Sequence, residues 1–136
     1  MSAEITLWAN RKNTRHYIGE NSRGAKVEIG MGEGQFTPGE LLKLALATCQ
    51  TLSADHTLAS KLGDDFDATV IVSSEKHDSE NRFTHISSRI ITDLSTLNEH
   101  ELQKLMERIN IAIDKNCTIG HTLEKGVKYD YTFEDE

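Results

Sequence analysis

Apolar residues alternate with other residues in two stretches near the start of the chain. One other residue separates Ile5 from Leu7 and Leu7 from Ala9, and one also separates Val27 from Ile29. A period of two is that of a β-strand. The segment 18–24 between them has the glycines and asparagine of a turn. Residues 5–30 are therefore expected to form two or three strands.

A glycine series follows these strands at Gly30, Gly32 and Gly34. No Lys-Ser or Lys-Thr pair follows it, and the spacing is not that of a dinucleotide-binding loop. It is not predicted to bind phosphate and indicates a flexible loop.

A long helix is predicted to begin at Pro38. Thr37 can cap it, proline is favoured in the first turn, and Glu40 places an acid near the positive end of the helix dipole. Residues 41–49 are apolar on almost every face, with Lys43 the only charge. Such a helix is expected to be buried and to carry Cys49 into the interior before it stops near Gly63.

The middle of the chain predicts a hairpin and a second helix. Residues 68–72 alternate in the period of a strand, and 83–92 follow as a returning strand after a polar turn. Asn98 and Glu101 have the spacing of a capping box. Apolar residues then recur at helical spacing to about Lys115.

The end of the chain predicts a short helix and a last strand. Asn116 is expected to cap a helix that holds Cys117 in its first turn and ends at Gly126. Alternating apolar residues from Val127 to Phe133 predict a final strand. The order is ββ(β)αββααβ, which is an α+β fold in one domain over residues 1–136.

Composition and charge argue against several classes of partner. The chain has 136 residues, of which 37% are hydrophobic, and a formal net charge of -7. An acidic chain is repelled by nucleic acid and by anionic membranes, so neither is an expected partner. No apolar run reaches the roughly 20 residues of a membrane span, and residues 1–4 lack the core of a signal peptide. The expected location is the cytoplasm.

Cys49 and Cys117 are the two cysteines. Neither they nor the six histidines have metal-ligand spacing, so no metal is predicted. A position near a helix start favours the thiolate and is expected to lower the pKa of Cys117. Cys49 lies on an apolar helix, where its thiolate would need a cation and where a cysteine is often a packing residue. Both interpretations of each cysteine stay open on these grounds.

The run from Pro38 to Cys49, followed by Asn116-Cys117 and Leu123-Glu124-Lys125-Gly126-Val127, resembles the OsmC/Ohr family of osmotically inducible and organic-hydroperoxide-resistance proteins. The resemblance covers nearly the whole chain. It implies antiparallel sheets around a long buried central helix, an intertwined homodimer, and active sites at the subunit interface. It also implies thiol peroxidase activity.

In that family the cysteine of the central helix attacks the peroxide. The resemblance therefore implies that Cys49 becomes a sulfenic acid and that Cys117 resolves it to a disulfide. An organic hydroperoxide would be the substrate. An external dithiol reductant protein, for which the family suggests a lipoyl dithiol, would reopen the disulfide, and no bound cofactor is implied.

The family also uses an arginine of the early strands to hold the thiolate. Counting back from Ser22-Arg23-Gly24 assigns this role to Arg15, with Arg11 and Arg23 as alternatives. The family orients that arginine with a glutamate directly after the helix proline. Here Gly39 occupies that position, and Glu40 follows one residue later. Glu40 can serve in its place or simply stabilise the helix start.

Three further residues bear on the chemistry. Thr118 stands where hydroperoxidases of the family usually have proline. His121 is one helical turn after Cys117, and His56 is on roughly the same helical face as Cys49, so either could act on a thiol or be an ordinary surface histidine.

Two other functions compete with a peroxidase. The same dimer could bind an apolar small molecule or sense redox state without efficient turnover. Alternatively, the chain could be an interaction protein whose cysteines only pack.

Overall fold

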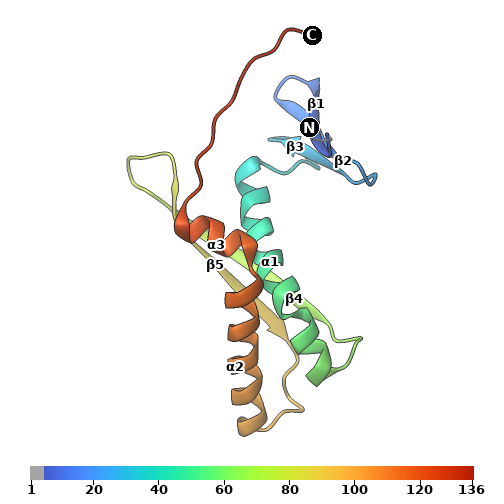
Figure 1. Cartoon of the computed structure of the whole chain (residues 1–136), viewed down its shortest axis with the longest axis vertical. Helices are drawn as coiled ribbons and strands as arrows, with labels where there is room; N and C mark the ends of the chain where they lie inside the picture. Colours follow the sequence, from blue (N-terminus) through green and yellow to red (C-terminus); the bar gives the residue numbers. More distant parts are fainter. Residues whose placement is uncertain (1–4) are drawn as a thin grey trace, which may run out of the picture. The chain divides into compact units, whose positions relative to one another are not determined.

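The computed structural model describes residues 5–136 and has two compact units (Figure 1). One unit ends at Leu44, and the other runs from Ala45 to Glu136. Residues 1–4, to which the signal-peptide prediction referred, lie outside the described residues. The single domain expected over 1–136 stays a prediction. None of the helices among residues 5–136 combines the length and the hydrophobicity of a membrane span.

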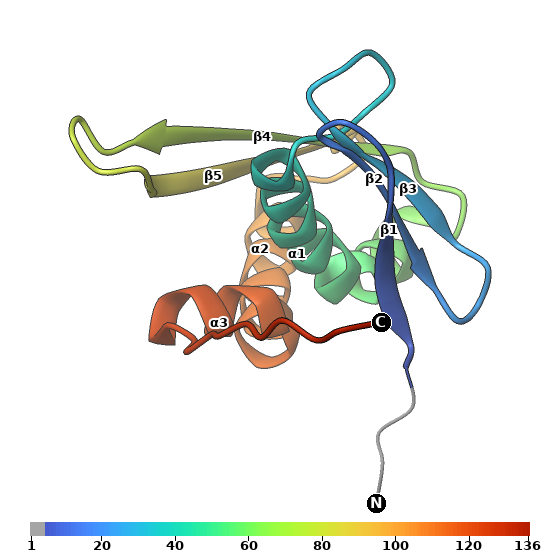
Figure 2. The same ribbon diagram turned by 90° about the horizontal axis from the view of Figure 1, so that it is seen from above.

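The first unit contains a three-stranded antiparallel sheet, which confirms the opening strands. Its strands β1 (Leu7–Asn13), β2 (His16–Asn21) and β3 (Lys26–Gly30) are hydrogen-bonded in that order (Figure 2). Arg15 forms the turn between β1 and β2 with a φ of 55°. That left-handed conformation is uncommon for a residue with a side chain.

The glycine loop after β3 is held by Gln35. The Gln35 side chain accepts a hydrogen bond from the Gly32 N–H at 3.0 Å, and the Gly30 N–H donates to the Phe36 carbonyl at 2.9 Å. A Cβ at position 30 would lie 2.1 Å from Gln35 Oε1 and 2.8 Å from the Arg15 carbonyl oxygen. Glycine is thus required at position 30 because Gln35 and the Arg15 backbone approach it closely. The sequence had instead indicated a flexible loop.

Helix α1 (Pro38–Leu62) begins where the sequence predicted. Its residues from Ala45 onward belong to the second unit, with β4 (Ala68–Lys76), β5 (Phe83–Thr92), α2 (Glu99–Asn116) and α3 (Thr118–Lys125). β4 and β5 pair in antiparallel register and confirm the hairpin. The Asn98–Glu101 capping box at the start of α2 is also confirmed.

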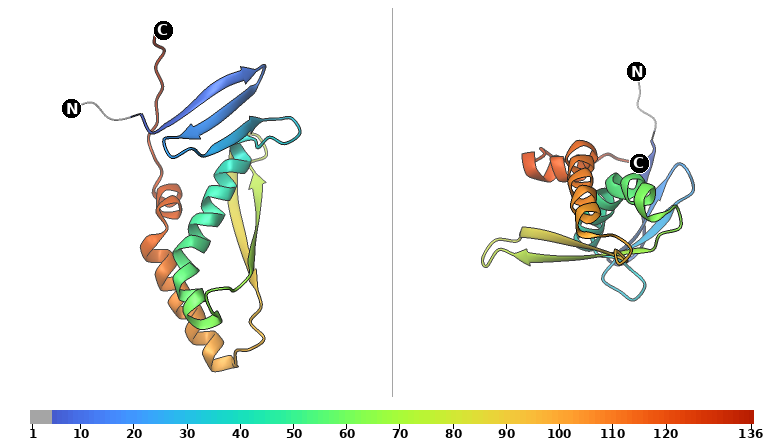
Figure 3. Two further views of the ribbon diagram at one scale, coloured as in Figure 1. Left: turned by 90° about the vertical axis from the view of Figure 1, so that its right-hand side faces the viewer. Right: turned by 90° about the horizontal axis from the view of Figure 1, so that it is seen from below.

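The core of the second unit lies between α1 and α2. Ala54 and Leu58 from α1 are buried against Leu105 and Ile109 from α2. Figure 3 shows α2 running alongside the second half of α1. The two helices therefore fix each other and the segments that carry the two cysteines.

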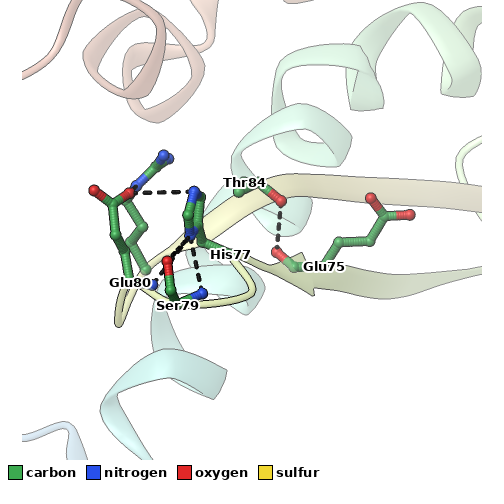
Figure 4. Close-up of polar contacts among 6 residues, drawn as sticks. Glu75, His77, Ser79, Glu80 and Thr84 are labelled. Atoms are coloured by element: carbon green, nitrogen blue, oxygen red, sulfur yellow. Dashed lines mark hydrogen bonds and ion pairs between the residues drawn. The ribbon is translucent and has the colours of Figure 1, made fainter.

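The hairpin tip is closed by His77. Its Nδ1 accepts the backbone N–H groups of Ser79 at 3.1 Å and Glu80 at 3.0 Å (Figure 4). The Arg82 guanidinium pairs with Glu80 at 2.6 Å, and the Thr84 hydroxyl donates to the Glu75 carbonyl at 3.3 Å. These polar contacts explain why the polar segment between the strands turns the chain.

Two expectations were wrong, one about a final strand and one about the burial of α1. Residues 126–136 form no helix or strand, so the predicted last strand from Val127 to Phe133 is absent from the described chain. Tyr129 is 93% exposed and Phe133 94%. A strand needs a neighbouring strand for its hydrogen bonds, and within residues 5–136 none pairs with this segment. Likewise α1 is not covered on every face, because Leu52 is 75% exposed.

Candidate functional site

The two cysteines meet although they lie far apart in the sequence. Cys49 is half-buried in α1, and Cys117 is buried with 2% of its surface exposed. Both are free thiols, and Cys49 lies near enough to Cys117 to raise its pKa. The packing of α1 against α2 brings them into the same part of the second unit.

Cys117 itself begins α3. Asn116 ends α2 and does not cap the third helix, which corrects the expectation. Cys117 occupies the junction between the two helices, and its Sγ accepts the N–H of Gly120 at 3.4 Å. Its own N–H still donates to the Ile113 carbonyl at 3.0 Å. The backbone of α2 therefore holds the residue, and the backbone of α3 holds its sulfur.

Gly120 provides the space that this sulfur occupies. A Cβ at position 120 would lie 3.1 Å from Cys117 Sγ, which is tighter than ordinary contact. Sequence reasoning missed this residue. Its signal was the spacing of three residues from Cys117, which is the distance at which an N-cap group meets a backbone N–H.

The pKa of Cys117 is raised, not lowered as expected. Burial is the main cause, because it removes water from the thiolate, and the neighbouring Cys49 thiol raises it further. The N–H groups of Gly120 and Ile119 lower it only in part. Desolvation thus outweighs the helix dipole, and Cys117 is held as a neutral thiol at pH 7. A neutral thiol is a poor first nucleophile.

Glu40 completes a capping box at the start of α1. Its carboxylate accepts the Thr37 N–H at 2.9 Å, while the Thr37 hydroxyl accepts the Glu40 N–H at 3.1 Å. These bonds from Thr37 lower the pKa of Glu40. This geometry matches the interpretation of Glu40 as a residue that stabilises the helix start. Its action on an arginine stays a prediction.

Arg11 and Arg15 line one cavity of about 370 Å³ in the first unit, together with Tyr17 and Ile29. Arg23 does not line it and lies in the turn after β2. Arg15 and Glu40 belong to the first unit and both cysteines to the second. The contact of an arginine with Cys49 therefore stays a prediction.

The two candidate histidines, His121 and His56, both lie on helices. The His121 ring nitrogen Nε2 is hydrogen-bonded to the Asp114 carbonyl oxygen, and His56 is exposed on α1. Across the described part of the chain, no group of three His, Cys, Asp or Glu side chains could hold a metal ion.

A second cavity lies close to the thiols. It measures about 500 Å³ and is lined by four apolar residues of the second unit, Leu46, Phe83, Ile86 and Leu123, and by Thr84, His85 and Glu124. Leu46 is one helical turn before Cys49, and a Cβ at Gly120 would lie 3.9 Å from it. The cavity thus adjoins the residues that surround Cys117, and its lining suits an apolar group.

Comparison with known proteins identifies the chain's relatives. The family model described as "OsmC-like protein" matches residues 30–132. An uncharacterized protein of Mycobacterium tuberculosis strain H37Rv and one of Mycobacterium bovis are each 45% identical over 122 residues, which is 88% of this chain and 89% of theirs.

Two solved structures share the fold. An OsmC-like protein from Mycoplasma pneumoniae has a TM-score of 0.66 at 16% identity, over 91% of this chain and 89% of that one. The organic hydroperoxide resistance protein OhrB of Bacillus subtilis has a TM-score of 0.51 at 20% identity, over 87% and 90%. With the family match over most of its length, the chain belongs to the OsmC-like family.

Proposed function

We propose that the protein is a thiol peroxidase that reduces organic hydroperoxides in oxidative stress defence. The observation that carries this proposal is the proximity of two free thiols from distant parts of the chain. Membership of the OsmC-like family supports it, and so does the fold shared with OhrB, whose name states organic hydroperoxide resistance.

The chemistry divides between the two cysteines. The Cys49 thiolate attacks the terminal oxygen of the hydroperoxide, the O–O bond breaks, and the leaving alkoxide takes a proton to become an alcohol. Cys49 is then a sulfenic acid. The Cys117 sulfur attacks it, a disulfide forms and water leaves. The peroxide gains two electrons, and the pair of cysteines loses two.

The raised pKa of Cys117 disfavours it for the first step and leaves it the second, in which its proton departs with the sulfenic hydroxyl as water. A neutral buried thiol does not compete for the peroxide, and it sits beside the sulfur that it must attack. An external dithiol reductant then reopens the disulfide by thiol exchange, with a lipoyl dithiol as the proposed class. No bound cofactor is required by this sequence of steps.

Substrate choice follows from the apolar cavity beside Leu46. Its lining of Phe83, Ile86 and Leu123 favours an alkyl or aryl group over water, so an organic hydroperoxide should outcompete hydrogen peroxide. We assign the thiolate-holding cation to Arg15, with Arg11 and Arg23 as rivals. Glu40 is the candidate to orient it, in addition to its bond with Thr37.

The working form is proposed to be a cytoplasmic homodimer. Leu52 on α1 and Tyr131 in the tail are large apolar residues with 75% and 82% of their surface exposed. Exposed apolar surface of this kind is typical of an interface. A second copy would cover it and could provide the neighbouring strand that Val127–Phe133 lacks. The cytoplasm would keep the thiols reduced between cycles.

Steady-state turnover tests this proposal. The protein is mixed with dihydrolipoamide and either cumene hydroperoxide or hydrogen peroxide, and loss of peroxide is followed. Turnover is expected with both, faster with cumene hydroperoxide. Cys49→Ser should abolish it, and Cys117→Ser should leave at most a single turnover with this reductant. Full activity in Cys49→Ser would contradict the proposal.

A second function is favoured by two residues that depart from the family pattern, Gly39 and Thr118. If catalysis has been lost, the same thiols would be oxidised once per molecule, and the protein would sense redox state or bind an apolar molecule. Stoichiometric oxidation without cycling, with every reductant tried, would favour this second function.

A further inference from the structure

A basic cavity lies between the end of α1 and the first half of α2, where the two helices run side by side (Figure 3). It measures about 150 Å³, and its lining belongs entirely to the second unit: Lys61, His100, Glu101, Lys104, Leu105 and Arg108. Three of these side chains are cationic at pH 7 and one is acidic, although the chain as a whole has a formal net charge of -7. Positive charge is therefore concentrated here against the balance of the chain.

The carboxylate in this lining is already engaged. Glu101 Oε1 accepts the Asn98 N–H at 3.2 Å in the capping box, and Glu101 Oε2 pairs with Lys61 Nζ at 2.7 Å. The bond with Lys61 is the main reason why the pKa of Glu101 is lowered. Lys61 thus compensates the charge of Glu101, and the remaining cations of the cavity are left without it.

Those cations follow one another along α2. His100, Lys104 and Arg108 are four residues apart, so they lie on one face of the helix, where like charges repel. Among the side chains of residues 5–136, no carboxylate forms an ion pair with Lys104 or Arg108. Two neighbouring cations without an acidic partner complement an anion.

Arg108 is held toward α1 by one hydrogen bond. Its guanidinium donates to Ser60 Oγ at 3.5 Å, and the Ser60 hydroxyl donates to the Thr57 carbonyl at 2.7 Å. The other N–H groups of the guanidinium remain to donate to an oxyanion. Leu105 is 2% exposed and supplies an apolar wall. Both helices therefore contribute to the cavity.

We propose that this cavity binds a phosphate group, either free or in a small phosphate monoester. Lys104 and Arg108 donate to its oxygens, and His100 adds a third nitrogen at the same face. The cavity has several times the volume of about 30 Å³ that a water molecule occupies in the liquid, so a compact tetrahedral anion can enter. The acidic net charge of the chain disfavours long polyanions and leaves a small one.

This site is separate from the thiols. Arg108 precedes Cys117 by nine residues, which is about 14 Å along a helix at 1.5 Å per residue. Neither cysteine lines the cavity. Phosphate binding here is therefore a property beyond the proposed peroxidase reaction.

NMR titration of the full chain with inorganic phosphate, at pH 7.5 and constant ionic strength, tests the proposal. Saturable amide shifts are expected at Lys61 and at residues 100–108. Arg108→Gln and Lys104→Gln should each weaken binding roughly fivefold, as expected for one ion pair. Both side chains are exposed, so both variants should fold.

The matched control is Lys115→Gln. It removes the same charge from an exposed position in the last turn of α2, outside the cavity lining. It should change the affinity for phosphate less than twofold.

Two further ligands define the anion. Nitrate carries one charge, whereas a phosphate group carries close to two at this pH, so nitrate should bind roughly fivefold more weakly. Glycerol 3-phosphate should show the same losses in Arg108→Gln and Lys104→Gln. Tighter binding of glycerol 3-phosphate than of inorganic phosphate would identify a monoester as the source, and the reverse order would identify free phosphate.

Three outcomes would overturn the inference. Shifts that increase without saturation would show that no site exists. Equal losses in Arg108→Gln and Lys115→Gln would reduce the effect to net charge, and equal affinity for nitrate would remove the preference for phosphate. Each of these results would leave the peroxidase proposal untouched, because that reaction uses the two thiols.

Discussion

The thiol of Cys117 accepts the N–H of Gly120 at 3.4 Å, and the neighbouring thiol of Cys49 raises its pKa. One sulfur is on the central helix, and the other is at the junction of α2 and α3. The arrangement keeps the buried thiol neutral and places it within reach of its partner.

Gly120→Ala should slow disulfide formation. The added Cβ would approach Cys117 Sγ to 3.1 Å, so the sulfur or the helix must shift by a few tenths of an ångström. Alanine is favoured over glycine in a helix by about 1 kcal/mol, which offsets part of the strain, so the variant should fold. Stopped-flow measurement of thiol loss after one equivalent of peroxide checks this.

The matched control for Gly120→Ala is Lys125→Ala, an exposed change in the same helix. It should leave the rate of disulfide formation close to that of the unaltered protein. Equal rates in all three proteins would show that Gly120 does not position the sulfur.

Alkaline pH should destabilise the reduced protein through Cys117. Its pKa is raised in the folded state, so the folded protein holds the proton more tightly than the unfolded chain does. The free energy of unfolding should therefore be unaffected below the ordinary thiol pKa and fall as pH rises above about 9. Urea unfolding at pH 7, 9 and 10 under reducing conditions measures it.

Cys117→Ser provides the comparison for this pH series. Serine at position 117 does not titrate in this range, so the variant's loss of stability above pH 9 should be smaller than that of the unaltered protein. Parallel curves for the two proteins would contradict the assignment.

The start of α1 should depend on Thr37 more than on the charge of Glu40. Thr37→Ala removes the hydroxyl that accepts the Glu40 N–H and should cost about 1 kcal/mol of unfolding free energy. Glu40→Gln keeps a side-chain oxygen for the Thr37 N–H and should change stability much less. Denaturant unfolding of both variants tests this.

The same Glu40→Gln variant bears on catalysis. If Glu40 acts only at the helix start, peroxide turnover should be retained, whereas a carboxylate that orients an arginine should be needed for it. Turnover reduced at unchanged stability would therefore assign Glu40 to the reaction.

The C-terminal tail should be needed for the proposed dimer. Tyr129, Tyr131 and Phe133 are at least 82% exposed, and a chain that leaves such residues in water is expected to bury them against another copy. Removal of residues 127–136 should convert a sedimenting dimer to a monomer. Removal of 134–136 alone, which takes only acidic residues, should leave the dimer intact.

Local signals in the sequence predicted most of the elements. The proline after Thr37, the Asn98–Glu101 capping box and the alternation in 83–92 each depend on near neighbours, and each element formed. The final strand did not, because a strand also depends on a partner that the sequence does not specify. The alternation from Val127 to Phe133 is real but has no neighbouring strand within the described chain.

The site was predictable in its residue types but not in its energetics. The sequence singled out Cys49 and Cys117, and the fold brings them together. The dipole argument gave the wrong direction for the pKa of Cys117, because burial depends on the packing of α2 and α3 around it. Gly120 and the Arg11–Arg15 cavity needed coordinates, since both arise from residues that meet only in space.

The central claim is that Cys49 and Cys117 form a disulfide when an organic hydroperoxide reacts. Intact mass spectrometry, with and without thiol alkylation, after one equivalent of cumene hydroperoxide measures this directly. The account predicts the loss of two hydrogens and of both alkylation sites, faster than with hydrogen peroxide and absent in Cys49→Ser. Two thiols that remain fully alkylated after peroxide treatment would contradict it.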